Sequence, residues 1–333
     1  MKQILNTVKF TLILAIGIGL LLLAFRGVDV DSAMKEIAGA DFFWLFMSIL
    51  VSLAAFFSRA YRWNMLIDTM GYRPKMANTS TALMIGYLAN LAVPRLGEVT
   101  RCGTLTREEK IPFEKLIGTV ILERLIDVLC LLACMVFTAF SEKDKLGNFL
   151  NENIFDPAKA KVQGLLHSPL LLAGVVLVFL LLVIWVFRKK KSSSAESKFT
   201  KILKGVTEGM VAIKKLKSPF WFLFHTAFIW VMYFLMSFLC FKSLEHTAQL
   251  DWHAGMFVLV AGAMGMSAPV NGGVGTYHIL VSQGLIIYGV AKEHGIAFAT
   301  LMHGTQTLIV IILGGLSFLY LFLRERKLNA KQS

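Results

Sequence analysis

The chain has 333 residues, of which 56% are hydrophobic and 17% are charged, and its formal net charge is +13 at pH 7. The charged share lies below the roughly 25% typical of soluble domains, and a mean hydropathy of +0.66 argues against a soluble enzyme. Because the basic residues lie in short stretches between apolar segments, they indicate a membrane protein, and we expect no nucleic-acid partner.

Apolar segments follow one another along the chain. They span roughly residues 8–25, 42–58, 79–93, 112–140, 166–187, 219–241, 254–290 and 296–323. Six of them look long enough to cross hydrocarbon, which takes about 20 helical residues. The first exceeds the apolar core of a signal peptide and no small-x-small cleavage site follows it, so we interpret it as a retained transmembrane helix.

Two of the apolar segments are interrupted by proline and glycine. The segment 79–93 stops at Pro94, and the segment 254–290 is broken between Ser267 and Gly275. Irregular backbone at membrane depth is tolerated only where it is buried in protein or lines a wet cavity. We therefore predict an all-α integral membrane protein with about six spanning helices and two re-entrant broken hairpins.

The two interruptions resemble each other. The runs 94–101 and 269–277 each contain a proline, a glycine turn and then a threonine, about half the chain apart. Interrupted segments in corresponding halves indicate the binding site of a transporter with an inverted repeat. The repeat halves would be about 1–165 and 166–325, within one transmembrane domain over 1–333. A chance similarity between two Gly/Pro turns is the alternative.

The distribution of Lys and Arg predicts the orientation. The stretch 188–217 holds ten basic residues and 59–111 holds eight, whereas the loop 242–253 holds one. With six spanning helices, both basic stretches and both termini are cytoplasmic, with 188–218 as a basic loop. The segments predicted to lie outside are 26–41, 242–253 and 291–295. The loop 141–165 departs from the rule, because it carries four lysines and yet falls outside.

Ionisable residues lie in the middle of the segment 112–140. Each costs at least about 2.5–3.5 kcal/mol near the centre of a spanning helix, so such groups usually face a bundle interior or a substrate pathway. Glu123 and Asp127 share one helix face, and Arg124 is offset from Glu123 by about 100°. They either take part in a substrate site or form an ion-pair cluster that only holds the bundle together.

Polar residues also flank the two interruptions. Arg95, Glu98 and Arg101 follow the first, where guanidinium groups could bind phosphate and a broken helix end offers backbone donors. Anchoring at the cytoplasmic interface is the alternative for Arg95 and Arg101. The second interruption lacks the spacing of a phosphate loop, so we expect no nucleotide site. Its candidate residues are Asn271, Gly272, Gly273, Thr276 and Tyr277.

Other polar residues have simpler interpretations. Arg59 and Arg62, at the end of the second apolar segment, are interpreted as anchors that extend to the interface. His303 is interpreted as a packing histidine, although it shares a helix face with Gln306. The four cysteines form neither a disulfide framework nor a metal set. With no catalytic or nucleotide motif present, we predict no catalytic residues, no cofactor, no metal and no enzymatic activity.

These motifs, in this order, resemble the lysylphosphatidylglycerol synthase transmembrane-region family. The runs 94–101, 123–127 and 268–277 carry the resemblance, which covers about residues 5–325. It implies a flippase-like region, which in bifunctional members accompanies a cytosolic domain that makes aminoacylated phosphatidylglycerol; similar regions occur alone or beside glycosyltransferase domains. Because this chain ends about ten residues after its last apolar segment, we expect a stand-alone translocase without synthase activity.

The leading hypothesis is a lipid translocase of the inner membrane. Arg95, Arg101 and Arg124 would engage phosphate, and the turn 271–277 would form the opposite gate. The acids Glu98, Glu123 and Asp127 would hold these arginines or receive a cationic headgroup. The expected partners are membrane lipids (an anionic phospholipid, or an aminoacylated or isoprenoid-phosphate lipid), and homo-oligomerisation stays open. The alternatives are a membrane-embedded lipid transferase and a scaffold for a separate lipid-modifying synthase.

Overall fold

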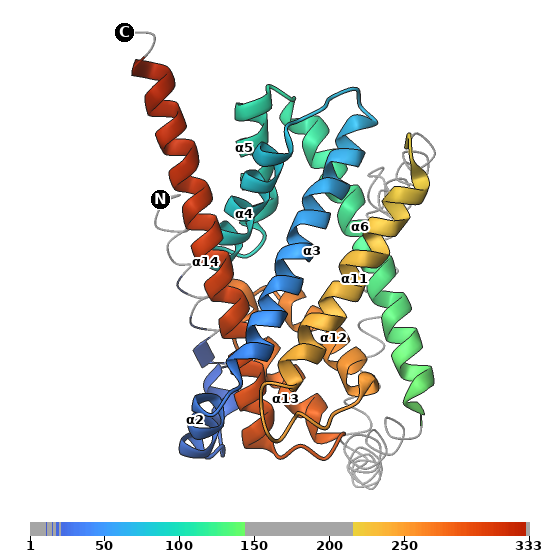
Figure 1. The fold of residues 1–333 in the computed structure, drawn as a ribbon, viewed down its shortest axis with the longest axis vertical. Coiled ribbons are helices and arrows are strands. Elements are labelled where there is room, and N and C mark those ends of the chain that lie inside the picture. Colours follow the sequence, from blue (N-terminus) through green and yellow to red (C-terminus); the bar gives the residue numbers. More distant parts are fainter. Residues whose placement is uncertain (1–10, 12–14, 16–17, 20, 144–215, 331–333) are drawn as a thin grey trace, which may run out of the picture. The chain divides into compact units, whose positions relative to one another are not determined.

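The computed structural model describes residues 11, 15, 18–19, 21–143 and 216–330, and every regular element in these residues is a helix (Figure 1). The predicted all-α class is confirmed. The expected span 166–187, nearly all of the basic loop 188–218 and half of the segment 8–25 lie outside the described residues. The elements are α2 (Val30–Ala38), α3 (Phe42–Asp68), α4 (Met76–Ala92), α5 (Leu96–Glu109), α6 (Phe113–Ser141), α11 (Pro219–Phe241), α12 (Trp252–Ser267), η2 (Asn271–Gly273), α13 (Thr276–Ile286) and α14 (Lys292–Ala330).

The chain divides into two units, Met1–Thr138 with Gly209–Ser333, and Ala139–Glu208. All of the helices above belong to the first unit, apart from the last residues of α6. Among the described residues, three helices are long and apolar enough to cross a membrane: α3, α11 and α14. α6 is also long, at 29 residues, but carries Glu123, Arg124 and Asp127 in its interior. Exposed phenylalanine and leucine side chains along these helices suit contact with lipid.

Two helical hairpins enter the first unit from opposite ends and meet in its middle (Figure 1). α4 and α5 form the first, joined by a turn at 93–95; α12 and α13 form the second, joined by 268–275. The turns lie where the proline and glycine interruptions predict them. The four helices have 17, 14, 16 and 11 residues, fewer than the about 20 that a membrane crossing takes.

The two turns are made in different ways. In the first, Arg95 adopts a left-handed conformation with φ of 64°, which is uncommon for a residue with a side chain. In the second, Gly272, Gly273 and Gly275 all have positive φ, at 57°, 76° and 83°. Glycine adopts these angles without steric cost, so the sequence at this turn matches its backbone.

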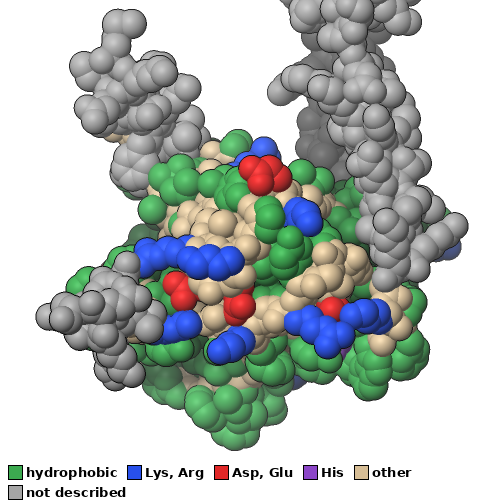
Figure 2. Space-filling view, turned by 90° about the horizontal axis from the view of Figure 1, so that it is seen from above, with side chains coloured by type: hydrophobic (Ala, Val, Ile, Leu, Met, Phe, Trp, Pro, Cys, Tyr) green, Lys and Arg blue, Asp and Glu red, His purple; other side chains and the backbone are tan. Residues whose placement is uncertain are grey.

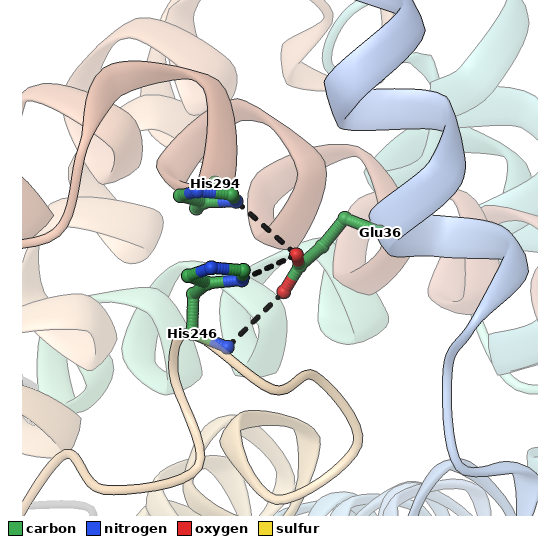
Figure 3. A group of neighbouring side chains, drawn as sticks. All are labelled: Glu36, His246 and His294. Atoms are coloured by element: carbon green, nitrogen blue, oxygen red, sulfur yellow. Dashed lines mark hydrogen bonds and ion pairs between the residues drawn. The ribbon is translucent and has the colours of Figure 1, made fainter.

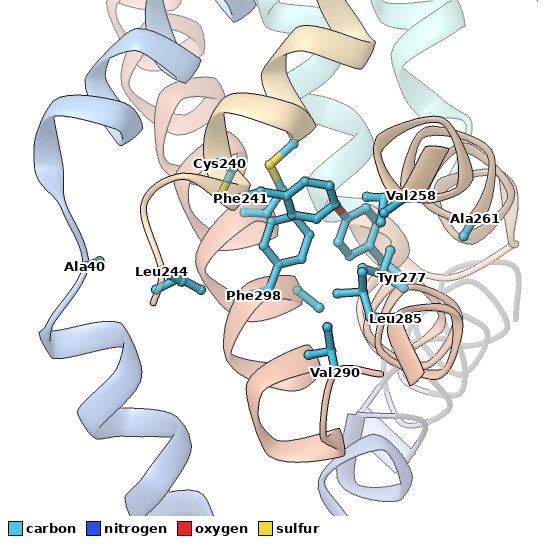
Figure 4. Packing of buried hydrophobic residues seen from close by; sticks show 14 of the residues in the cluster. Ala40, Cys240, Phe241, Leu244, Val258, Ala261, Tyr277, Leu285, Val290 and Phe298 are labelled. Carbon is cyan, nitrogen blue, oxygen red and sulfur yellow. The ribbon is translucent and has the colours of Figure 1, made fainter. Parts of the chain in front are cut away.

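Each hairpin packs in a hydrophobic core of its own. The core around the first hairpin comes from α3, α4, α5, α6 and the segment before α6, and contains Trp63, Ile67, Ala82, Cys102, Leu105, Ile111, Leu116 and Val120. The core around the second is built on Phe241, Tyr277 and Phe298, shown in Figure 4 with their neighbours. The rings of Phe241 and Phe298 lie 4.8 Å apart, centroid to centroid. These hydrophobic contacts hold each hairpin against the long helices.

The connections between helices gather at two ends of this unit (Figure 1). The connections 69–75, 110–112 and 216–218 lie at one end with the C-terminal part of α14, and the connections 39–41, 242–251 and 287–291 lie at the other. The charge pattern predicts this same grouping. Figure 2 shows the first end, where basic and acidic side chains alternate across the surface. Its exposed basic residues include Arg73, Lys75, Arg107, Lys110, Lys115 and Lys217.

Candidate functional site

Five charged side chains meet inside the first unit, and we call them the buried charge cluster: Arg59, Arg62, Arg101, Glu123 and Asp127. Arg59 Nη2 lies 2.7 Å from an oxygen of Glu123 and 2.7 Å from an oxygen of Asp127. Arg62 Nη2 lies 2.7 Å from the other oxygen of Asp127, and Arg101 Nη1 lies 3.1 Å from Glu123 Oε2. The side chains of Arg62 and Glu123 are 0% exposed. Such charges persist in a low-dielectric interior only because they are paired.

Helical periodicity explains how each element contributes to the buried charge cluster. Arg59 and Arg62 are three residues apart on α3, and Glu123 and Asp127 are four apart on α6, so each pair shares one face. The predicted common face of Glu123 and Asp127 is confirmed, because both acids bind Arg59. Arg101 approaches from α5, one helix of the first hairpin.

Neutral side chains complete the cluster. On α11, the hydroxyl of Tyr233 accepts a hydrogen bond from Arg59 Nη1 at 2.9 Å, and Thr226 Oγ1 lies 3.5 Å from Arg62 Nη1. The guanidinium of Arg101 lies over the indole ring of Trp63, 4.7 Å from its centroid. The cluster therefore connects three long helices, α3, α6 and α11, to the first hairpin.

The charges in the cluster do not balance. Three arginines face two acids, which leaves a formal excess of one positive charge. Arg101 has the most spare donors: among the described residues its Nε and Nη2 have no hydrogen-bond partner, whereas Arg59 and Arg62 each leave Nε without one. A buried donor without a partner costs about 1–3 kcal/mol, and an anion can satisfy it. The cluster is therefore suited to binding a negatively charged group.

Arg124 and Glu98 form a second, outer ion pair. Arg124 Nη2 lies 2.7 Å from Glu98 Oε1, and the Arg124 side chain is 42% exposed. Arg124 follows Glu123 directly but points to α5 rather than to Asp127. Arg95, at the turn of the first hairpin, is exposed. The predicted residues of this half therefore divide into members of the buried charge cluster (Arg101, Glu123, Asp127) and an accessible group (Arg95, Glu98, Arg124).

The turn of the second hairpin contacts the turn of the first. Asn271 donates a hydrogen bond from Nδ2 to the carbonyl oxygen of Ala92 at 3.0 Å. His303 on α14 donates from Nε2 to the carbonyl oxygen of Gly272 at 2.8 Å. Because the ring of His303 also stacks on Tyr277, with centroids 5.1 Å apart, its interpretation as a packing histidine agrees with the structure.

The remaining residues predicted in the second half lie within their own hairpin. The Thr276 hydroxyl donates to carbonyl oxygens of its own hairpin, at 2.8 Å to Gly265 and 3.0 Å to Gly273. Tyr277 is buried in the core around Phe241. Substrate contact by these residues stays a prediction, and the contacts that the structure gives them stabilise the turn.

Sequence reasoning missed Arg59 and Arg62. Their interpretation as interfacial anchors is wrong, because both side chains are buried and paired with acids. Arg59 lies nine residues before the end of α3, about 14 Å along the helix axis at 1.5 Å per residue. This depth, together with two acids in another apolar segment that require cationic partners, could have predicted that the arginines are buried and paired.

Replacing Asn271 with alanine tests the contact between the two turns. We expect the midpoint of thermal unfolding in detergent to fall, because the Ala92 carbonyl loses its donor at a cost of about 1–3 kcal/mol. Gln306→Ala is the control, since Nε2 of this nearby amide has no hydrogen-bond partner among the described residues. Equal effects of the two substitutions would contradict a role for the contact.

Comparison with known proteins supports the family suggested by the motifs. The family model described as Lysylphosphatidylglycerol synthase TM region matches residues 10–314. Comparisons with curated proteins and with solved structures found no match. The match covers both hairpins and every helix of the buried charge cluster. The chain therefore belongs to the lysylphosphatidylglycerol synthase TM region family, a family of multi-pass membrane domains that act on membrane lipids.

Proposed function

We propose that this protein is a lipid translocase, which moves a phospholipid or a lipid-linked headgroup across the inner membrane. The observation that carries the proposal is the excess positive charge of the buried charge cluster, to which the first hairpin contributes Arg101 from α5. Excess charge in a protein interior is costly inside a membrane, and it is typical of sites that bind a charged substrate. A lipid phosphate provides the complementary charge.

In this proposal both hairpins are re-entrant and form an inverted repeat. Three observations support it: their helices are short, they come from opposite ends of the unit, and their turns touch through Asn271 and Ala92. The end with exposed Arg73, Lys75 and Lys110 would face the cytoplasm, together with the end of α14. Irregular backbone at 93–95 and 268–275 would then lie at membrane depth, where it can line a polar path.

The proposed path uses the accessible group first. Arg95 and Arg124 would bind the phosphate, and Glu98 would compete with it for Arg124. The unpartnered donors of Arg101 would receive the phosphate next, while the acyl chains stay in lipid. The turn 271–277 would close the opposite side of this path.

We propose translocation rather than chemistry on the lipid. General acid–base catalysis requires a group that exchanges protons with the substrate. Glu123 and Asp127 each lie within ion-pair distance of two or more guanidinium groups, so their carboxylate oxygens are engaged by arginine. Their arrangement suits fixed electrostatic binding.

A transport assay in proteoliposomes tests the proposal. Labelled phosphatidylglycerol, aminoacylated phosphatidylglycerol and an isoprenoid phosphate would be compared for wild type and Arg124→Gln. We expect wild type to move at least one of these lipids, and Arg124→Gln to slow that transport about tenfold or more, since a hydrogen bond to a charged group contributes about 1.5–3 kcal/mol.

The control is Arg73→Gln. Arg73 lies in the connection that follows α3, its side chain is 81% exposed, and it pairs with Asp68 at the end of that helix. It should transport at the wild-type rate. Wild-type protein that moves none of the three lipids would overturn the proposal, and so would equal slowing by the two substitutions.

A further inference from the structure

A second group of ionisable side chains, shown in Figure 3, lies at the end of the unit that holds the connections 39–41, 242–251 and 287–291. Glu36 comes from α2, His246 from the connection after α11, and His294 from the first turn of α14. The three residues are distant in the sequence, so no spacing motif predicts that they come together. Because 56% of the residues are hydrophobic, a convergence of two imidazoles and a carboxylate is informative.

The three side chains converge on one point. Nδ1 of His246 lies 2.6 Å from Glu36 Oε2, and Nδ1 of His294 lies 3.1 Å from the same oxygen. The two imidazole rings stack in parallel, with centroids 3.5 Å apart and an angle of 7° between their planes. Both Nδ1 atoms therefore face the carboxylate from the same side, as Figure 3 shows.

The carboxylate is fixed in this position. Its side chain is only 6% exposed, and its other oxygen, Oε1, accepts a hydrogen bond from the backbone N–H of His246 at 3.2 Å. A bond of this kind to the oxygen that does not coordinate is what orients a metal ligand. His246 is more open, which provides access from solvent.

Two imidazole nitrogens and one carboxylate oxygen form a ligand set for a first-row transition ion. Zinc takes nitrogen ligands at about 2.0–2.1 Å and carboxylate oxygen at about 2.0–2.2 Å, so tetrahedral ligands lie about 3.4 Å apart. To admit the ion, the observed 2.6 and 3.1 Å would widen by less than about 1 Å, and the two parallel rings would tilt so that both Nδ1 lone pairs point at it. Calcium and magnesium prefer ligand sets made of oxygen alone, so this set does not suit them.

We propose that Glu36, His246 and His294 bind a divalent transition-metal ion of the zinc class, which joins α2, the connection after α11 and the start of α14. Three protein ligands leave a fourth position for water or another ligand. The ion would hold together three segments at the end of the unit where the second hairpin begins. The proposal stands independently of lipid transport.

Zinc binding to the purified full-length protein tests the proposal. After chelator treatment and buffer exchange, titration with Zn²⁺ alone should give one ion per chain by calorimetry and by elemental analysis. His246→Ala, His294→Ala and Glu36→Gln should each weaken this binding by more than the roughly 10- to 100-fold that loss of an outer-sphere partner costs. The control is His253→Ala, a histidine that pairs with Asp251 outside this group.

A stability readout separates the metal from a simple ion pair. Zinc should raise the unfolding midpoint of wild type and of His253→Ala. It should leave the unfolding midpoints of His246→Ala and Glu36→Gln unchanged. Lower pH should weaken zinc binding, because protons compete for the imidazole nitrogens. The proposal is overturned if wild type binds no zinc or if the ligand variants bind it as tightly as wild type. It is also overturned if the unfolding midpoint of wild type changes with pH but not with zinc.

Discussion

Replacing Glu123 with glutamine is expected to destabilise the protein by about 3–5 kcal/mol and to abolish lipid transport. Glu123 is fully buried and lies within ion-pair distance of Arg59, Arg62 and Arg101. Without its charge, three buried guanidinium groups would face Asp127 alone, and removal of one partner from a buried ion pair carries a penalty of this size. Arg101 would lose its acidic partner, so the first hairpin would keep only the partly exposed Glu98–Arg124 pair as an ionic attachment to α6.

The matched control is Glu98→Gln, the same chemical change in the partly exposed pair with Arg124. It should cost less than about 1 kcal/mol, because solvent-exposed ion pairs contribute little to stability. Unfolding midpoints in detergent, with transport measured on the folded fraction, give both quantities. A Glu123→Gln protein as stable as Glu98→Gln would show that the buried charge cluster is not the main ionic support of the fold.

Replacing Gly97 with alanine is expected to separate α5 from α4 and to destabilise the first hairpin by about 1–3 kcal/mol or more. A Cβ atom on Gly97 would lie 2.6 Å from Cγ of Asn90 and would collide with the carbonyl oxygen of Gly86. The Gly97 N–H also donates a hydrogen bond to Asn90 Oδ1 at 2.6 Å. The Asn90 side chain therefore cannot move aside for the new Cβ without breaking this hydrogen bond. Transport should fall with stability, because Glu98 and Arg101 follow on the same helix.

Gly103→Ala on the same helix is the control, with an effect of opposite sign. No atom lies within 4 Å of the Cβ that this change would add, and alanine in a helix interior is favoured over glycine by up to about 1 kcal/mol. The unfolding midpoint should therefore rise or stay constant for Gly103→Ala and fall for Gly97→Ala. A Gly97→Ala protein with wild-type stability would mean that the two helices do not approach each other so closely.

The sequence predicts those features that depend on neighbouring residues. Pro94 and the glycines at 272–275 interrupt helices locally, so the positions of both turns follow from the residues themselves. The common face of Glu123 and Asp127 follows from helical periodicity alone.

Other features depend on which helix faces meet. Near the end of an apolar helix, Arg59 has the same local pattern whether it extends to the interface or pairs with an acid. The packing of α3 against α6 and α11 decides between the two. The convergence of Glu36, His246 and His294 is equally a matter of long-range packing, and no property of the separate segments predicts it.

The contact between the two turns has a mechanical consequence. The short irregular segments of the two hairpins meet in the middle of the unit, where the side-chain amide of Asn271 bonds to the backbone at Ala92. In the proposed translocase, the path would open here when the turns move apart by a few ångströms while α3, α11 and α14 keep their places. The barrier would then be only one turn thick, with the long helices as a stationary frame and the two turns as the parts that move.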